Sequence, residues 1–177
     1  MENKKYKVIY ADPPWSYGDK QNTKLRGGAI KHYPTMSTKD ISSLKVKEIT
    51  EDNAVLFLWV TSPLLPDAFE VIKGWGFKYK TSFVWDKIKH NMGHYNSVRH
   101  EFLLIATKGS CTPEYKRLFD SVVDVERTIH SRKPLIFREY IEILYPSGKR
   151  IELFAREKIK DWDSWGNEVA NDIELTK

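Results

Sequence analysis

The spacing of apolar residues along the chain predicts alternating β-strands and α-helices. Continuous apolar runs at residues 8–11 and 54–60 are typical of strands that are buried on both faces of a sheet. After the second run, the Thr-Ser-Pro stretch at residues 61–63 starts a segment with apolar residues at helical spacing. The next predicted strand covers residues 81–85. Strand, helix and strand at this spacing predict a right-handed unit with a parallel pair of strands.

The same alternation continues to the end of the chain. Ser37 and Asp40 form a variant of the capping box, which predicts a helix start. An amphipathic helix is predicted to open at residues 131–134. Further strands, the middle one a short edge strand, are predicted at residues 101–107, 121–126 and 149–155. We therefore expect an α/β fold with a doubly wound, mostly parallel sheet, built as a single domain over residues 1–177.

Two polar segments, residues 16–36 and 86–100, follow neither period. The first is rich in basic residues, so we expect it to contact a nucleic-acid backbone, although a solvated connection is the alternative. Its basic residues include Lys20, Lys24, Arg26, Lys31 and His32. The second contains His90 and His94, but no Glu follows His90 and no cysteine is near. We interpret it as a substrate-facing basic loop and expect no metal site.

Composition narrows the class of protein without deciding its function. The chain is 41% hydrophobic and 30% charged with a net charge of +5, which is typical of a globular protein and permits nucleic-acid binding. Cys111 is the single cysteine, so an internal disulfide is excluded. The first residues contain no apolar signal region, and the longest apolar run, 54–60, is too short to cross a bilayer. We therefore expect a cytoplasmic protein without a membrane segment.

The first apolar run ends at Asp12-Pro13-Pro14-Trp15. Ligands of open α/β sheets bind at the carboxyl ends of the strands, which is where this carboxylate is expected. A carboxylate and a proline carbonyl can each accept one N–H bond of an exocyclic nucleobase amine, while Trp15 offers a face for stacking. Asp and Pro are also ordinary turn residues, so a plain strand end is the alternative.

More than this tetrapeptide matches one family. The chain resembles adenine N6-methyltransferases that use S-adenosylmethionine, a family that includes the catalytic subunit of the messenger-RNA adenine methyltransferase. It is more similar to the bacterial and phage branch. The matching segments are Ala11-Asp-Pro-Pro-Trp15, Tyr33-Pro-Thr-Met36, Leu56-Phe-Leu-Trp-Val-Thr61, His130-Ser-Arg-Lys-Pro134, Ile151-Glu-Leu-Phe-Ala-Arg156 and Trp165-Gly-Asn-Glu168. The resemblance implies a Rossmann-like class I methyltransferase fold with permuted motifs, the catalytic motif first and the cofactor motif last.

The resemblance also implies a site. Asp12, Pro13, Pro14 and Trp15 would be catalytic. S-adenosyl-L-methionine would be bound by Asp12, Lys133, Phe154, Arg156, Asn167 and Glu168. These side chains suit the task, because Asn and Glu can satisfy ribose hydroxyls, the two cations can hold a carboxylate and Phe154 can line the adenine. Glu168 stands where the messenger-RNA enzyme has an amide.

The target base must leave its stack to reach Asp12. The resemblance places Tyr33 beside that base, next to His32, and the basic residues Lys20, Lys24 and Arg26 would hold the substrate backbone. Trp15 and Trp59 would form stacking walls, or Trp59 would belong to the core.

The expected reaction is methyl transfer to adenine N6 in DNA by a bacterial or phage-encoded enzyme. The alternatives are an RNA adenine methyltransferase, a non-catalytic nucleic-acid-binding subunit and a cytosine N4-methyltransferase. No separate target-recognition domain is visible. The polar segments 16–36 and 86–100, a homodimer or a partner subunit are therefore expected to read the target.

Overall fold

The computed structural model describes residues 4–17, 34–127 and 132–176. These residues form a seven-stranded sheet in the order β5-β3-β4-β2-β1-β6-β7. Its strands are β1 (Tyr6–Ala11), β2 (Thr50–Val60), β3 (Lys78–Met92), β4 (Ser97–Lys108), β5 (Val122–Asp124), β6 (Arg150–Leu153) and β7 (Asp163–Trp165). The mixed α/β architecture is consistent with the Rossmann-like methyltransferase fold that the sequence predicted.

Most neighbouring strands run parallel. β1 pairs in parallel with β2 and β6, β6 with β7, and β3 with β5. Only β4 is antiparallel to both of its neighbours, β2 and β3. The prediction that β2, α3 and β3 form a unit with a parallel pair was wrong in one respect. The two strands run in the same direction, but β4 lies between them.

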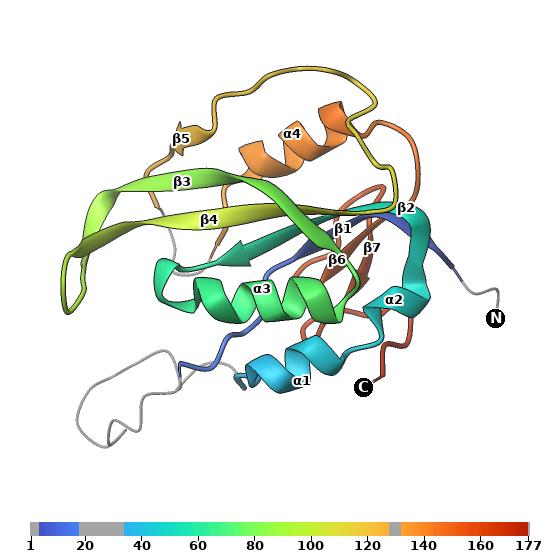
Figure 1. Ribbon diagram of the computed structural model, residues 1–177, viewed down its shortest axis with the longest axis horizontal. Coiled ribbons are helices and arrows are strands. Elements are labelled where there is room, and N and C mark those ends of the chain that lie inside the picture. Colours follow the sequence, from blue (N-terminus) through green and yellow to red (C-terminus); the bar gives the residue numbers. More distant parts are fainter. Residues whose placement is uncertain (1–3, 18–33, 128–131, 177) are drawn as a thin grey trace.

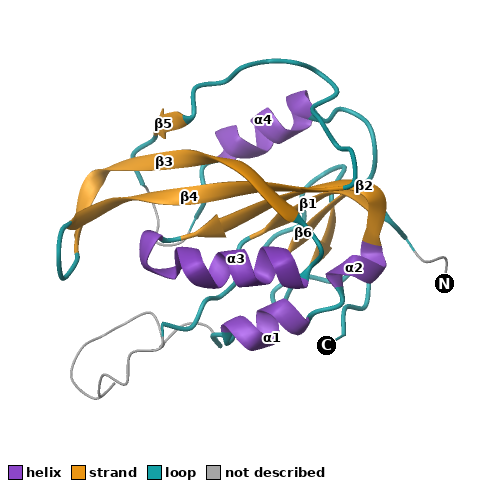
Figure 2. Ribbon diagram, viewed as in Figure 1, coloured by secondary structure: helices purple, strands orange, loops and turns teal. Residues whose placement is uncertain are grey.

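Helices cover both faces of the sheet, as a doubly wound fold requires. The short helices α1 (Thr38–Ser43) and α2 (Val46–Ile49) lie with α3 (Leu65–Gly74) on one side, and α4 (Leu135–Leu144) lies on the other (Figures 1 and 2). The predicted cap of α1 is confirmed, because Ser37 Oγ accepts the Asp40 N–H at 3.1 Å. A 3₁₀ turn, η2 (Ser62–Leu64), leads into α3.

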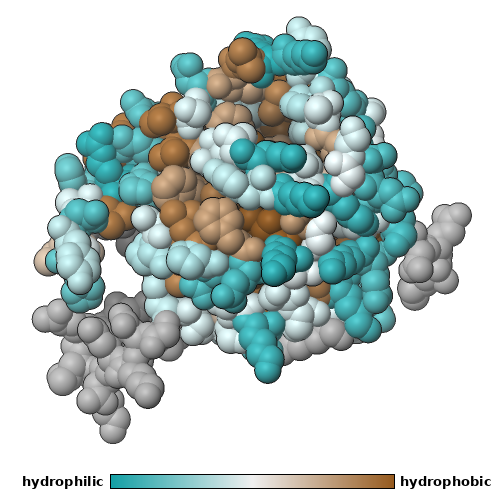
Figure 3. Space-filling model, viewed as in Figure 1, coloured by the Kyte–Doolittle hydropathy of each residue, from teal (hydrophilic) through white to brown (hydrophobic). Residues whose placement is uncertain are grey.

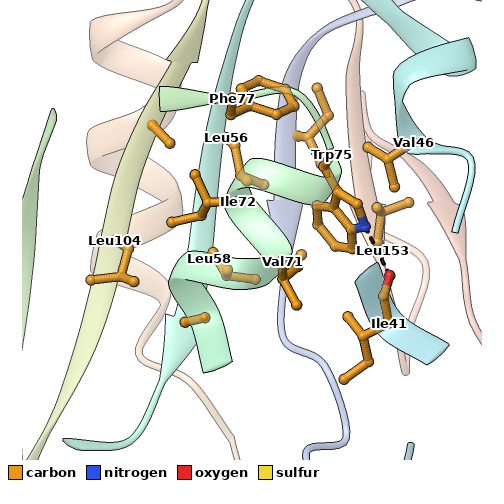
Figure 4. Close-up of a cluster of buried hydrophobic side chains, with 14 of the residues drawn as sticks. Ile41, Val46, Leu56, Leu58, Val71, Ile72, Trp75, Phe77, Leu104 and Leu153 are labelled. Atoms are coloured by element: carbon orange, nitrogen blue, oxygen red, sulfur yellow. Dashed lines mark hydrogen bonds between the residues drawn. The ribbon is translucent and has the colours of Figure 1, made fainter. Parts of the chain in front are cut away.

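The core between α3 and the sheet is made of buried apolar side chains (Figure 4). Val71 and Ile72 of α3 pack toward β2, where Leu56 and Leu58 are fully buried. Trp75, which caps the carboxyl end of α3, donates its indole N–H to the Ile41 carbonyl at 2.8 Å. This bond ties α1 to α3, because it satisfies two polar groups that would otherwise be buried without partners.

The segment 86–100, which was predicted to be a loop, is mostly a β-hairpin. β3 and β4 continue to Met92 and from Ser97, so only residues 93–96 form the connection. The sequence gives no strand period here because the hairpin extends beyond the rest of the sheet and its side chains are largely exposed. The register shifts between Asp86 and Asn91, where Ile88 has φ 63°. A bulge of this kind bends a hairpin and increases its twist.

Apolar side chains also reach the surface. Phe69 of α3 and Tyr79 of β3 are both partly exposed, with their rings 5.2 Å apart in an edge-to-face arrangement. Figure 3 shows such apolar patches between hydrophilic side chains. Within the part of the chain that the structure describes, the helices are too short and too polar to cross a bilayer.

Candidate active site

The Asp12-Pro13-Pro14-Trp15 segment leaves the sheet at the carboxyl end of β1, between β2 and β6. Met36 then pairs with it in an isolated parallel bridge to Trp15. Pro14 O accepts the Met36 N–H at 2.8 Å, and Pro13 O accepts the Trp15 N–H at 2.9 Å. Each proline carbonyl has a second lone pair, so both remain able to accept one more hydrogen bond.

Trp15 is held in place by the strand next to it. Its indole N–H donates to the Trp59 carbonyl of β2 at 3.0 Å. Trp59 itself is fully buried, and its own indole N–H donates to the Tyr10 hydroxyl at 2.7 Å. Of the two interpretations of Trp59, the structure therefore favours the core residue. The side chain of Trp59 packs in the core next to the site, while its backbone carbonyl holds the indole of Trp15.

A chain of alternating charges surrounds Asp12. Lys133, just before α4, places Nζ 3.0 Å from Asp12 Oδ2 and 3.0 Å from Glu101 Oε2 of β4. Glu101 also pairs with Lys87 of β3. The Lys133 ammonium lies 5.4 Å from the centre of the Trp59 ring, within cation–π distance. Glu101 and Lys87 were not predicted from the sequence.

Burial and neighbouring charges set the pKa values of this group. Burial raises the pKa of Asp12, and the nearby Lys133 only partly offsets that rise. Burial also acts to raise the pKa of Glu101, but Lys133 and Lys87 outweigh it and the pKa is lowered. Burial lowers the pKa of Lys133, whereas Asp12 and Glu101 raise it further, so the net direction is upward. Lys133 therefore stays a cation and Glu101 an anion at neutral pH.

A pocket of about 400 Å³ opens on one side of Asp12. Five of the six side chains predicted to bind the cofactor line it, namely Asp12, Phe154, Arg156, Asn167 and Glu168. Phe154 follows β6 with φ 63°, in the left-handed region that residues other than glycine seldom adopt, and its ring packs edge-to-face against Trp165 at 5.4 Å. Arg156 Nε lies 3.9 Å from Glu168 Oε1. The two sequence-distant motifs therefore meet in one cavity.

A second pocket of about 240 Å³ adjoins the motif. It is lined by Asp12, Pro13, Pro14, Trp15, Tyr17, Thr35, Trp59, Val60, Thr61, Glu101, Lys133 and Arg156. Lys133, the sixth predicted cofactor residue, belongs to this pocket and not to the first. Asp12, Pro14 and Arg156 line both pockets. The predicted catalytic motif thus stands where two cavities adjoin.

The predicted substrate-binding residues fall outside the described part of the chain. These residues are Lys20, Lys24, Arg26, His32 and Tyr33. Tyr17, which precedes them, is half exposed and its hydroxyl is 2.7 Å from Thr61 Oγ1. Among residues 4–17, 34–127 and 132–176, no cluster of three or more His, Cys, Asp or Glu side chains could hold a metal.

The family model described as MT-A70 matches residues 6–168 of this chain. The chain is 39% identical over 193 residues to the Type II methyltransferase M.MunI of a Mycoplasma species, a match that covers 99% of this chain and 83% of that protein. It is 27% identical over 190 residues to the human N(6)-adenine-specific methyltransferase METTL4. It is also 27% identical over 175 residues to the human N(6)-adenosine-methyltransferase catalytic subunit METTL3.

These relatives differ in how much of their own length is matched. The chain spans most of the Mycoplasma protein, but only 38% of METTL4 and 28% of METTL3. In both human proteins the match still covers more than nine-tenths of this chain. What is shared with them is therefore one region of a longer protein.

Proposed function

Because this chain belongs to the MT-A70 family, we propose that it transfers a methyl group from S-adenosylmethionine to the N6 amine of an adenine in DNA. The observation that carries the proposal is the meeting of two pockets at Asp12 and Pro14. Relatives named as adenine and adenosine N6-methyltransferases support the chemistry. The match to a Type II methyltransferase, which covers 99% of this chain and 83% of that protein, favours DNA over RNA.

The first pocket suits S-adenosylmethionine in size and in the chemistry of its walls. Its volume of about 400 Å³ is within the usual range for small-molecule sites. Asn167 and Glu168 offer oxygen atoms for ribose hydroxyls, Phe154 offers an aromatic face and Arg156 offers a guanidinium for a carboxylate. When bound there, the cofactor would supply an electrophilic methyl group on a positively charged sulfur.

The second pocket would hold the adenine that has left its stack, with Trp15 in its wall. The adenine amine is a poor nucleophile because its lone pair is delocalised into the ring. Hydrogen bonds from its two N–H groups to the Asp12 carboxylate and to a proline carbonyl would turn that lone pair toward the first pocket. This is catalysis by position and by charge, because the nitrogen becomes positive as the new bond forms and Asp12 is negative.

Lys133 would keep this arrangement ready. Its ammonium lies 3.0 Å from both Asp12 and Glu101, and Lys87 supplies a second positive charge to Glu101, so the charges of the two carboxylates are balanced by two cations. After methyl transfer, the N6 nitrogen still carries both of its protons and is positively charged. The Asp12 carboxylate would stabilise that charge until the proton is released to water.

The test is methyl transfer from labelled S-adenosylmethionine to DNA and RNA of the same sequence, with wild type, Asp12→Asn and Asp12→Ala. Asn keeps one acceptor oxygen but not the charge, so we expect a loss of about 10²–10³ in kcat, and Ala should abolish turnover. Calorimetry with the same cofactor serves as the control for donor binding, and circular dichroism as the control for folding. Turnover that persists in Asp12→Ala would remove Asp12 from the mechanism. If the label appears in RNA and not in DNA, RNA is the substrate and the DNA proposal is wrong.

A further inference from the structure

The hairpin formed by β3 and β4 extends past the rest of the sheet. β4 pairs with β2 only as far as Phe102, opposite Val60 at the carboxyl end of β2. Beyond that point, residues 86–100, here called the arm, continue the sheet outward on the side where the active site opens. Figure 1 shows this hairpin projecting farther than the neighbouring strands. The arm therefore stands beside any substrate that enters the second pocket.

The arm begins next to the proposed active site. Glu101, which is paired in register with Trp85, contacts Lys133 in the second pocket. Ser97, where β4 begins, is four residues farther out, which corresponds to roughly 13 Å of strand. That length is comparable to the width and depth of the major groove of duplex DNA, about 12 Å and 8.5 Å. A duplex placed over the pocket would meet the end of the arm.

The charges of the arm fit a polyanion. Residues 87–100 contain no Asp or Glu, but three cations and three histidines. Lys87 is buried against Glu101, so Lys89 and Arg99 are the two cations of the arm that reach the surface. Lys89 pairs with Glu126, and Arg99 Nη2 lies 2.6 Å from Asp86 Oδ2. The Lys89–Glu126 pair is exposed on both sides and contributes little, so a phosphate group could replace its carboxylate at small cost. The Arg99 side chain is about half exposed, so it could bind a phosphate while it stays beside Asp86.

The end of the arm presents two large apolar side chains to solvent. Met92 and Tyr95 are fully exposed, and Ile88 is half exposed. Ile88 has a left-handed backbone conformation, and the Asp86 carboxylate accepts its N–H at 2.8 Å. Exposed aromatic and apolar side chains on a basic element can stack on nucleobases or wedge between base steps.

We propose that the arm inserts Tyr95 and Met92 into a groove of duplex DNA beside the target adenine and so assists its extrusion into the second pocket. This inference rests on the proposed function and names duplex DNA as the substrate form. A protein partner or a second copy of the chain could also cover an apolar tip. Asp86 is the single acid of the arm, so the excess of basic residues in its sequence favours nucleic acid, as does its position next to the proposed active site.

The test compares the double variant Met92→Ala/Tyr95→Ala with wild type and with Leu118→Ala. Leu118 is equally exposed but lies outside the arm, between β4 and β5, so it controls for the loss of surface apolar area. Each protein methylates two duplexes that differ only in whether the target adenine faces thymine or an abasic site. The paired adenine must be extruded at a cost of a few kcal/mol, whereas the unpaired one is already loose.

We expect the double variant to lose about ten-fold or more in kcat/KM on the paired duplex and about two-fold or less on the abasic one. Leu118→Ala should match wild type on both. An equal loss of kcat/KM on both duplexes would mean that Met92 and Tyr95 support folding or the active site and not base extrusion. No loss on either duplex would mean that the arm is not used. Both results overturn the proposal. Conversion of a wild-type dimer to monomer in the double variant, seen by sedimentation, would show a protein interface and also overturn it.

Fluorescence anisotropy with the paired duplex, without a methyl donor, separates this proposal from the proposed function. If wild type binds the duplex but never methylates it, the proposed function fails, and weaker binding by the double variant alone still supports the arm. If wild type methylates and the double variant binds and reacts as wild type does, the proposed function stands and the arm proposal fails.

Discussion

At the scale of single residues, Asp12 has conflicting demands. Burial disfavours its charge, yet the proposed reaction needs a carboxylate that accepts a hydrogen bond from the amine. Lys133 lowers its pKa and Glu101 raises it, although burial is the largest effect and the net shift is upward. As pH falls, activity should therefore be lost at a higher pH than for an ordinary aspartate.

The first prediction follows from the opposite signs of these two neighbours. Lys133→Met removes the cation, so the pKa of Asp12 rises and the acid limb of the kcat/KM profile moves to higher pH. Glu101→Gln removes the anion, so the same limb moves to lower pH. The pH dependence of kcat/KM for the two variants and wild type checks this, because it reports ionisations of the free enzyme. Shifts in the same direction for both variants would mean that another group controls the limb.

A second prediction concerns Tyr10, which accepts the indole N–H of the buried Trp59. Tyr10→Phe leaves that N–H without its partner, which should lower the free energy of unfolding by about 1–3 kcal/mol. Because the carbonyl of Trp59 holds Trp15, kcat should also fall. Urea denaturation and kinetics measure the two effects. Tyr79→Phe on the surface is the control, and equal stability in both variants would show that the bond to Trp59 contributes nothing.

The sequence located part of this site because certain residues belong to recognisable motifs. Asp12, Phe154, Arg156, Asn167 and Glu168 were expected together, and the structure lines one pocket with them. The place of Glu101 in the site could not be predicted. A carboxylate at the start of an apolar run indicates only where a strand begins. Its role depends on strand order, since only the insertion of β4 beside β2 brings it to Lys133.

At the scale of elements, the spacing of apolar residues predicted the buried strands well and the exposed strands poorly. The strands β1, β2 and β6 and the short edge strand β5 were expected near their observed positions. The arm was not, because most of its residues are polar and exposed and its two strands pair mainly with each other. The short β7 was also missed.

A third prediction tests the turn that ends β4. Gly109 has φ 62°, and a Cβ there would lie 2.3 Å from the backbone oxygen of Asp52. Gly109→Ala should therefore destabilise the protein by about 3 kcal/mol, near the upper end for such strain. Gly76 has φ 80°, but its Cβ would first meet the flexible end of Lys47, so Gly76→Ala should cost only about 1–2 kcal/mol. Equal losses in urea denaturation would exclude the backbone clash.

At the scale of the whole molecule, the order of the strands brings distant segments together. The proposed catalytic motif follows β1, while the residues just after β6 and those at and after the end of β7 line the first pocket. A ligand that binds only to the folded protein stabilises the fold by mass action. Binding of the proposed methyl donor should therefore raise the stability of this chain.

The fourth prediction uses this linkage. S-adenosylmethionine at about 100 times its Kd should add about 2.7 kcal/mol, which for a chain of this size raises Tm by roughly 5–10 °C. Asn167→Ala should reduce the increase, because it removes a polar group from the first pocket. Thr61→Ala, in the second pocket only, is the matched control. An unchanged Tm with the cofactor, alone and with DNA present, would favour a non-catalytic nucleic-acid-binding protein.

The most direct test of the account is the chemical identity of the product. DNA from cells that express wild type or Asp12→Ala is digested to nucleosides and analysed by mass spectrometry, with RNA from the same cells beside it. The account predicts N6-methyladenine in DNA from cells with the wild type, above the background of cells with Asp12→Ala. N4-methylcytosine in its place, or N6-methyladenine at the same level with both proteins, would contradict it.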